Sequence, residues 1–139
     1  MTDNTAITNG AHHIGLTVPD LTLTREFLEG ALGFRVVGEN ADYPAIFLSD
    51  GQLVITLWRA ENPEKATPFD RKQNIGLHHL ALKLSDDADL DNAYSRVSAW
   101  PGVEIEFQPQ PPGQGSRARH FICSIPGGLR LEIFAPAAA

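Results

Sequence analysis

The stretch Ala11-His12-His13-Ile14-Gly15-Leu16 returns later in the chain as Leu77-His78-His79-Leu80-Ala81-Leu82. Each copy opens an apolar run of the kind that forms a buried β-strand. Two histidine pairs at matching places in so short a chain indicate an internal duplication. A second match sets Leu53 on Leu129 and therefore Thr56 on Glu132, so the repeat extends to the end of each half.

Around these copies, the spacing of apolar residues predicts the order strand, helix, strand, strand, strand twice. In the first half we expect strands over 11–18, 34–37, 44–48 and 53–58, and a helix over 23–32. In the second half we expect strands over 75–84, 103–107, 120–125 and 129–134, and a helix over 89–100. The chain is therefore predicted to be one α+β domain, with module one at about 10–60, a linker at about 61–74 and module two at about 75–136.

Charge and composition exclude several classes of partner. The 139 residues include 17 acidic and 11 basic side chains, a net charge of −6, which provides no positive field for nucleic acid or an anionic membrane surface. No apolar stretch approaches the roughly 18 residues of a spanning helix, and the first residues lack the pattern of a secretory signal. We expect a cytoplasmic protein whose lone Cys123 is a buried structural thiol.

The repeated histidines predict a metal site. Side chains alternate across a strand, so the two histidines of a pair should point to opposite faces, and one from each pair should reach the same side of the fold. Glu132 lies between Leu131 and Ile133 in an apolar run, where a carboxylate needs a partner or a metal. Two imidazoles and one carboxylate form a facial triad that holds a divalent metal and leaves positions open for substrate.

Three segments resemble the vicinal oxygen chelate superfamily, which includes glyoxalase I, bleomycin- and fosfomycin-resistance proteins and type I extradiol dioxygenases. They are Val18-Pro-Asp-Leu21, Glu26-Phe-Leu-Glu-Gly-Ala-Leu-Gly-Phe34 and Pro126-Gly-Gly-Leu-Arg-Leu-Glu132. The resemblance implies two tandem β-α-β-β-β modules that form a cupped mixed sheet around a metal and substrate pocket, commonly completed in a homodimer. It also implies that the ligands come from the first and last strands of the modules.

On this sequence, the family pattern places the metal ligands at His13, His79 and Glu132, with Thr56 at the remaining position and His12 and His78 facing away. A threonine hydroxyl is a poor ligand and no base at neutral pH, which argues against glyoxalase I chemistry. The two histidines and one glutamate match the ligands of extradiol dioxygenases, although those enzymes are generally longer and carry further acid-base residues.

Five side chains besides the expected metal ligands are candidates for catalysis or substrate binding. His120 is expected either to act as a general acid or base beside the metal or to be an exposed residue at a strand end. Arg130 shares a face with Glu132 and is a candidate for an anionic substrate group. Trp58 and Phe134 are expected to wall the pocket, and Thr56 to contact the substrate.

The sequence therefore predicts a metal-dependent enzyme that chelates a small oxygenated organic substrate on a divalent metal, Fe2+ or else Zn2+, Ni2+ or Mn2+. Ring-cleaving dioxygenase and glyoxalase-like lyase or isomerase are the open reaction classes. The alternative is a non-catalytic binding protein of the drug-resistance type.

Overall fold

The computed structural model describes residues 5–85 and 87–137 and confirms the two β-α-β-β-β modules. Module one consists of β1 (His13–Val18), α1 (Leu21–Gly30), β2 (Arg35–Asn40), β3 (Ala45–Ser49) and β4 (Val54–Arg59). Module two consists of β5 (Leu80–Lys83), α2 (Leu90–Ser98), β6 (Glu104–Gln110), β7 (Arg119–Ser124) and β8 (Arg130–Ala135). Short 3-10 turns occupy Pro63–Lys65 in the linker and Asp87–Asp89 before α2.

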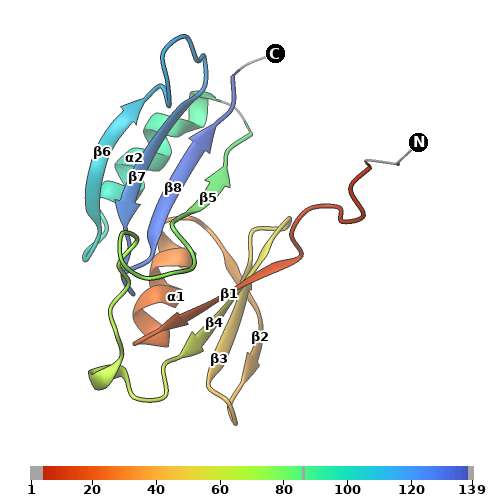
Figure 1. Ribbon diagram of the computed structural model, residues 1–139, viewed down its shortest axis with the longest axis vertical. Helices are drawn as coiled ribbons and strands as arrows, with labels where there is room; N and C mark the ends of the chain where they lie inside the picture. Colours follow the sequence, from red (N-terminus) through yellow and green to blue (C-terminus); the bar gives the residue numbers. More distant parts are fainter. Residues whose placement is uncertain (1–4, 86, 138–139) are drawn as a thin grey trace.

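Each module folds into its own four-stranded mixed sheet, with strand orders β1-β4-β3-β2 and β5-β8-β7-β6 (Figure 1). The pairs β1/β4 and β5/β8, at one edge of each sheet, are parallel, and the remaining pairs are antiparallel. Gly15 pairs with Thr56 in the first sheet, and Ala81 pairs with Glu132 in the second. These are the residues that the two sequence matches equate, so the duplication holds at the level of strand register.

Local sequence explains where the first helix begins and ends. The Asp20 carboxylate accepts a hydrogen bond from the Leu23 amide at 3.0 Å and caps α1. Past the end of the helix, Gly33 adopts φ 77° and the Phe34 amide donates to the Leu28 carbonyl. The chain then turns into β2 and places the apolar stripe of α1 against the sheet.

Alternation along the strands separates a core face from a site face in each sheet. Leu16, Val18, Ile55 and Leu57 are buried toward the helices in module one, as are Leu131, Ile133 and Ala135 in module two. The alternate residues of the same strands lie on the opposite face, which we call the site face. His13, Thr56 and Trp58 lie on the first site face, and Arg130, Glu132 and Phe134 on the second.

The strand predicted over 75–84 is shorter than expected. It begins at Leu80, which pairs with Leu131, and because β8 begins at Arg130 the residues before 79 have no partner in that strand. Gly76 has φ 140°, and Ile75 and Leu77 are exposed. The apolar run 75–79 is therefore a connecting segment.

The two modules meet where α1 contacts the turn between β7 and β8 and the residue Trp100 that follows α2. Thr24, only 1% exposed, donates its hydroxyl to the Pro126 carbonyl at 2.9 Å. Gly127 has φ 106°, and a Cβ there would come within 2.6 Å of the Thr24 hydroxyl, so this contact needs glycine. Phe27 on α1 packs edge-on against Trp100 with ring centroids 6.3 Å apart. One continuous apolar core results.

No helix among the described residues is long and apolar enough to cross a membrane. The location in the cytoplasm stays a prediction from the sequence.

We expect Thr24→Val to lower the free energy of unfolding by about 1–3 kcal/mol, because it removes the donor from the partly buried Pro126 carbonyl. Thr22→Val, at an exposed position of the same helix, is the matched control and should change little. Urea unfolding of the two variants measures the difference. Equal midpoints would show that the cross-module hydrogen bond contributes nothing.

Candidate metal and substrate site

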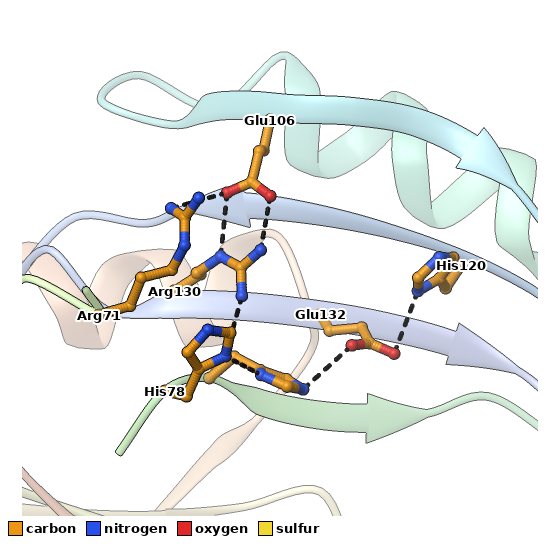
Figure 2. Close-up of polar contacts among 7 residues, drawn as sticks. Arg71, His78, Glu106, His120, Arg130 and Glu132 are labelled. Carbon is orange, nitrogen blue, oxygen red and sulfur yellow. Dashed lines mark hydrogen bonds and ion pairs between the residues drawn. The ribbon is translucent and has the colours of Figure 1, made fainter. Parts of the chain in front are cut away.

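Glu132 lies in the middle of the second site face, between two histidines (Figure 2). Its Oε1 is 3.3 Å from His79 Nε2, and its Oε2 is 3.2 Å from His120 Nδ1. The Glu132 side chain is 11% exposed and that of His120 is 12% exposed, whereas His79 remains 36% exposed. A carboxylate at this depth needs a hydrogen-bonding partner, a cation or a metal, and an imidazole nitrogen lies near each of its oxygens.

His120 is enclosed rather than exposed at its strand end. Its ring lies 5.0 Å from that of Phe107 and 6.4 Å from that of Phe134. Its Nδ1 is buried, and no residue of the described chain forms a well-directed hydrogen bond with it. His120, with its side chain 12% exposed, is therefore not the exposed residue of the second alternative, and its role as an acid or base stays a prediction.

The adjacent histidines contact each other instead of pointing to opposite faces. His78 Nδ1 lies 2.8 Å from His79 Nδ1, and His12 Nδ1 lies 2.9 Å from His13 Nδ1. The expected alternation is wrong here because β1 begins at His13 and β5 at Leu80, so each pair lies at or before the start of its strand.

Arg130 is paired with a carboxylate of its own protein. Its Nε and Nη2 bind Glu106 Oε1 and Oε2 at 2.9 and 2.6 Å, and its side chain is 12% exposed. The remaining nitrogen, Nη1, lies 3.2 Å from His78 Nδ1. Arg71 from the linker adds a second guanidinium to Glu106 at 3.2 Å.

These charges shift the protonation of their neighbours. The hydrogen bonds from Arg130 hold the pKa of Glu106 below its usual value. Partial desolvation, followed by the charge of Arg130, lowers the pKa of His78. Glu106 escaped sequence reasoning, although it lies in the alternating apolar and acidic stretch predicted as a strand over 103–107, a pattern that places acidic side chains on one face.

The first site face carries aromatic rings where the second carries charges. Trp58 Nε1 donates to the Thr56 hydroxyl at 2.9 Å, and this hydroxyl lies 3.5 Å from the Ile14 carbonyl. The Trp58 ring lies 5.0 Å from that of Tyr43 and 5.8 Å from that of Phe47. Thr56 thus holds the indole in place, and the three rings form an aromatic wall at the end of the β1/β4 pair away from His13, which lies in register with Val54.

The structure places His79 and His120 against different oxygens of Glu132 and leaves His13 on the other sheet, in contact with His12. Over residues 5–85 and 87–137, no three His, Cys, Asp or Glu side chains converge to hold a metal within one chain. Cys123 is buried on the core face, and burial raises the pKa of its thiol to about 12, as expected for a structural cysteine.

We expect Glu106→Gln to unfold at a lower urea concentration than the wild type at pH 7. The folded-state pKa of Glu106 is depressed, so its stabilising effect is present above the unfolded pKa of about 4.3 and disappears as the pH falls through the lower folded value. The difference between the two midpoints should therefore narrow as the pH falls below about 4.3 and vanish once Glu106 is protonated in the folded state as well. A difference that is independent of pH would contradict the ion pair as its cause.

Thr56→Val should destabilise the fold by about 1 kcal/mol and expose Trp58, because it removes the acceptor of the indole N–H. Thr56→Ser keeps the hydroxyl and is the matched control. Urea unfolding and a red shift of tryptophan emission measure the two effects. An emission spectrum unchanged in the valine variant would contradict this role of Thr56.

Comparison with known proteins agrees with this architecture. Residues 10–133 match the family model described as Glyoxalase/Bleomycin resistance protein/Dioxygenase superfamily. A 2-epi-5-epi-valiolone epimerase from Actinomyces sp is 27% identical over 143 residues, which covers 88% of this chain and 76% of that protein.

Solved structures share the fold. A glyoxylase/bleomycin resistance protein/dioxygenase domain from Frankia sp. EAN1pec superposes with a TM-score of 0.78 at 20% identity, covering 93% of this chain and 98% of that one. Fosfomycin resistance protein FosX from Listeria monocytogenes gives 0.73 at 21% identity, covering 95% and 94%. The family model spans most of the sequence, both modules included, and this chain belongs to the glyoxalase/bleomycin resistance protein/dioxygenase superfamily.

Proposed function

We propose that this protein is a metal-dependent isomerase that epimerises a small oxygenated ketone. The observation that carries the proposal is the buried Glu132 carboxylate, approached by His79 on one oxygen and by His120 on the other. The epimerase from Actinomyces sp supports isomerase chemistry over ring cleavage. A non-catalytic binding protein would have no need of a carboxylate buried between two imidazoles.

The chemistry of the side chains fits a divalent metal. Imidazole nitrogen and carboxylate oxygen suit Zn2+, Ni2+, Mn2+ and Fe2+. In one chain His79 and Glu132 are adjacent and His13 lies on the other sheet. We therefore propose that a homodimer completes the site, with His13 supplied by a second copy of the chain. When bound, the metal would polarise the oxygen atoms of the substrate.

The remaining residues would bind the substrate and move its proton. Epimerisation breaks a C–H bond next to the ketone, leaves the electron pair on the carbonyl oxygen, and returns a proton to the other face of that carbon. His120 Nδ1 lies 3.2 Å from Glu132 Oε2, so Nε2 is the nitrogen left to accept this proton, and a water molecule on the opposite side would supply the proton that is added to the other face. Phe134 and Trp58 would line the site, and Thr56 would orient Trp58.

We expect protein purified without a histidine tag to contain stoichiometric divalent metal, measured by elemental analysis. Glu132→Gln should lose the metal, because it replaces a charged ligand with a neutral amide. Glu104→Gln, an exposed carboxylate on β6 of the same sheet, is the matched control and should keep it. The proposal of a metal enzyme fails if the purified wild type contains no metal and the His79→Ala variant binds its ligands as tightly as the wild type.

Activity is tested with 2-epi-5-epi-valiolone in D2O, followed by NMR. Deuterium should enter at the carbon next to the ketone, and His120→Asn should slow the exchange by about 100-fold or more. A catechol that is cleaved with uptake of dioxygen would instead identify a dioxygenase. If the protein binds the ketone tightly but catalyses neither deuterium exchange nor oxygen uptake, it is a binding protein.

A further inference from the structure

A chain of polar contacts runs from the linker between the two modules to the proposed metal ligands (Figure 2). Each member contacts the next through side-chain nitrogen and oxygen atoms at 2.6–3.3 Å. In order, the members are Arg71, Glu106, Arg130, His78, His79 and Glu132.

The donor and acceptor roles along this chain follow from one residue. A guanidinium donates hydrogen bonds and cannot accept them, so His78 Nδ1, at 3.2 Å from Arg130 Nη1, must present its lone pair. The proton of neutral His78 is then on Nε2. His79 Nδ1 lies 2.8 Å from His78 Nδ1 and, because that atom carries no proton, must be the donor of this contact, so Arg130 and His79 share the one lone pair of His78 Nδ1.

We propose that Arg130 and His78 are positioning residues that fix His79 as its Nδ1–H tautomer, which leaves Nε2 with a free lone pair beside Glu132. This inference rests on the proposed function, since it assigns Nε2 to the metal. A ligating imidazole is commonly oriented in this way through its other nitrogen. The inference also changes the expected role of Arg130 from binding an anionic substrate to orienting a ligand.

Glu106 keeps the guanidinium in the required orientation. It binds two nitrogens of Arg130 in a bidentate fork, and the third nitrogen is thereby directed to His78. Arg71 ties the linker to the same carboxylate. With its side chain 12% exposed, Arg130 has little freedom to turn toward a substrate.

The first module contains the same histidine contact but, among the described residues, has no arginine that contacts the first histidine of the pair. His12 and His13 approach each other through Nδ1 at 2.9 Å, as in module two. The first residue of β4, however, is Val54, which lies in register with His13. The first residue of β8, the equivalent strand of module two, is Arg130. A valine side chain has no hydrogen-bond donor, so nothing at this position selects a tautomer for the first pair.

The test uses the metal-free, full-length protein labelled with 15N at histidine, at pH 8. Long-range 1H–15N correlation spectra distinguish protonation at Nδ1 from protonation at Nε2. We expect His79 to show Nδ1–H in the wild type and to lose this preference in Arg130→Met and His78→Leu. His78→Gln retains an acceptor oxygen and should restore it. His12→Leu, in the matched pair of module one, should leave the His79 signals unchanged.

The second measurement is the Kd for Zn2+, by competition with a chromophoric chelator. Arg130→Met and His78→Leu should weaken Zn2+ binding by about 10- to 100-fold, and His78→Gln by much less. The His78 variants retain the Glu106–Arg130 ion pair, so they test the inference even if Arg130→Met does not fold.

The two proposals fail in different ways. Wild-type protein that binds Zn2+ but carries the His79 proton at Nε2 when metal-free overturns the positioning role alone. The positioning role is also overturned if the His78→Leu and Arg130→Met variants keep the wild-type tautomer of His79 and the wild-type Kd for Zn2+. Wild-type protein with the Nδ1–H tautomer that binds no Zn2+ overturns the proposed function and leaves the hydrogen-bond assignment standing.

Discussion

The buried carboxylate of Glu132 is the constraint around which the second module is arranged. A charge in the middle of a central strand is costly unless groups that favour the ionised form surround it. Here β7 contributes His120 on one side, and the segment before β5 contributes His79 on the other. The parallel pairing of β5 with β8 and the antiparallel pairing of β7 with β8 make both approaches possible.

Duplication has produced two sheets with equal geometry and unequal chemistry. Strand register equates Thr56 with Glu132, but the threonine hydroxyl is engaged by the Trp58 indole, whereas the glutamate is engaged by two imidazoles. The first sheet offers a histidine and an aromatic wall, and the second offers charges. A site that needs both must combine the two kinds of sheet.

The way in which the modules pack explains why His13 and the His79–Glu132 pair do not meet within one chain. Contacts of α1 with Pro126 and Trp100 bury the core faces and leave both site faces uncovered by the helices. His13 consequently remains on the first sheet, in contact with His12, and not beside His79. This arrangement is the structural reason for proposing that two copies of the chain complete the site.

Sequence alone predicted the module order and the residue equivalences between the two halves, and it named His79, Glu132 and His120 as candidates for the site. These features depend on local apolar periodicity and on a repeat that is visible residue by residue. The strand predicted over 75–84 was too long, because strand length depends on where β8 offers a partner.

The contact within each histidine pair was also missed, since alternation holds inside strands and not at their beginnings. The pairing of Arg130 with Glu106 and Arg71 was decided by tertiary structure. These three residues come from β8, β6 and the linker, and no local pattern in the sequence states which charges will meet when distant segments pack.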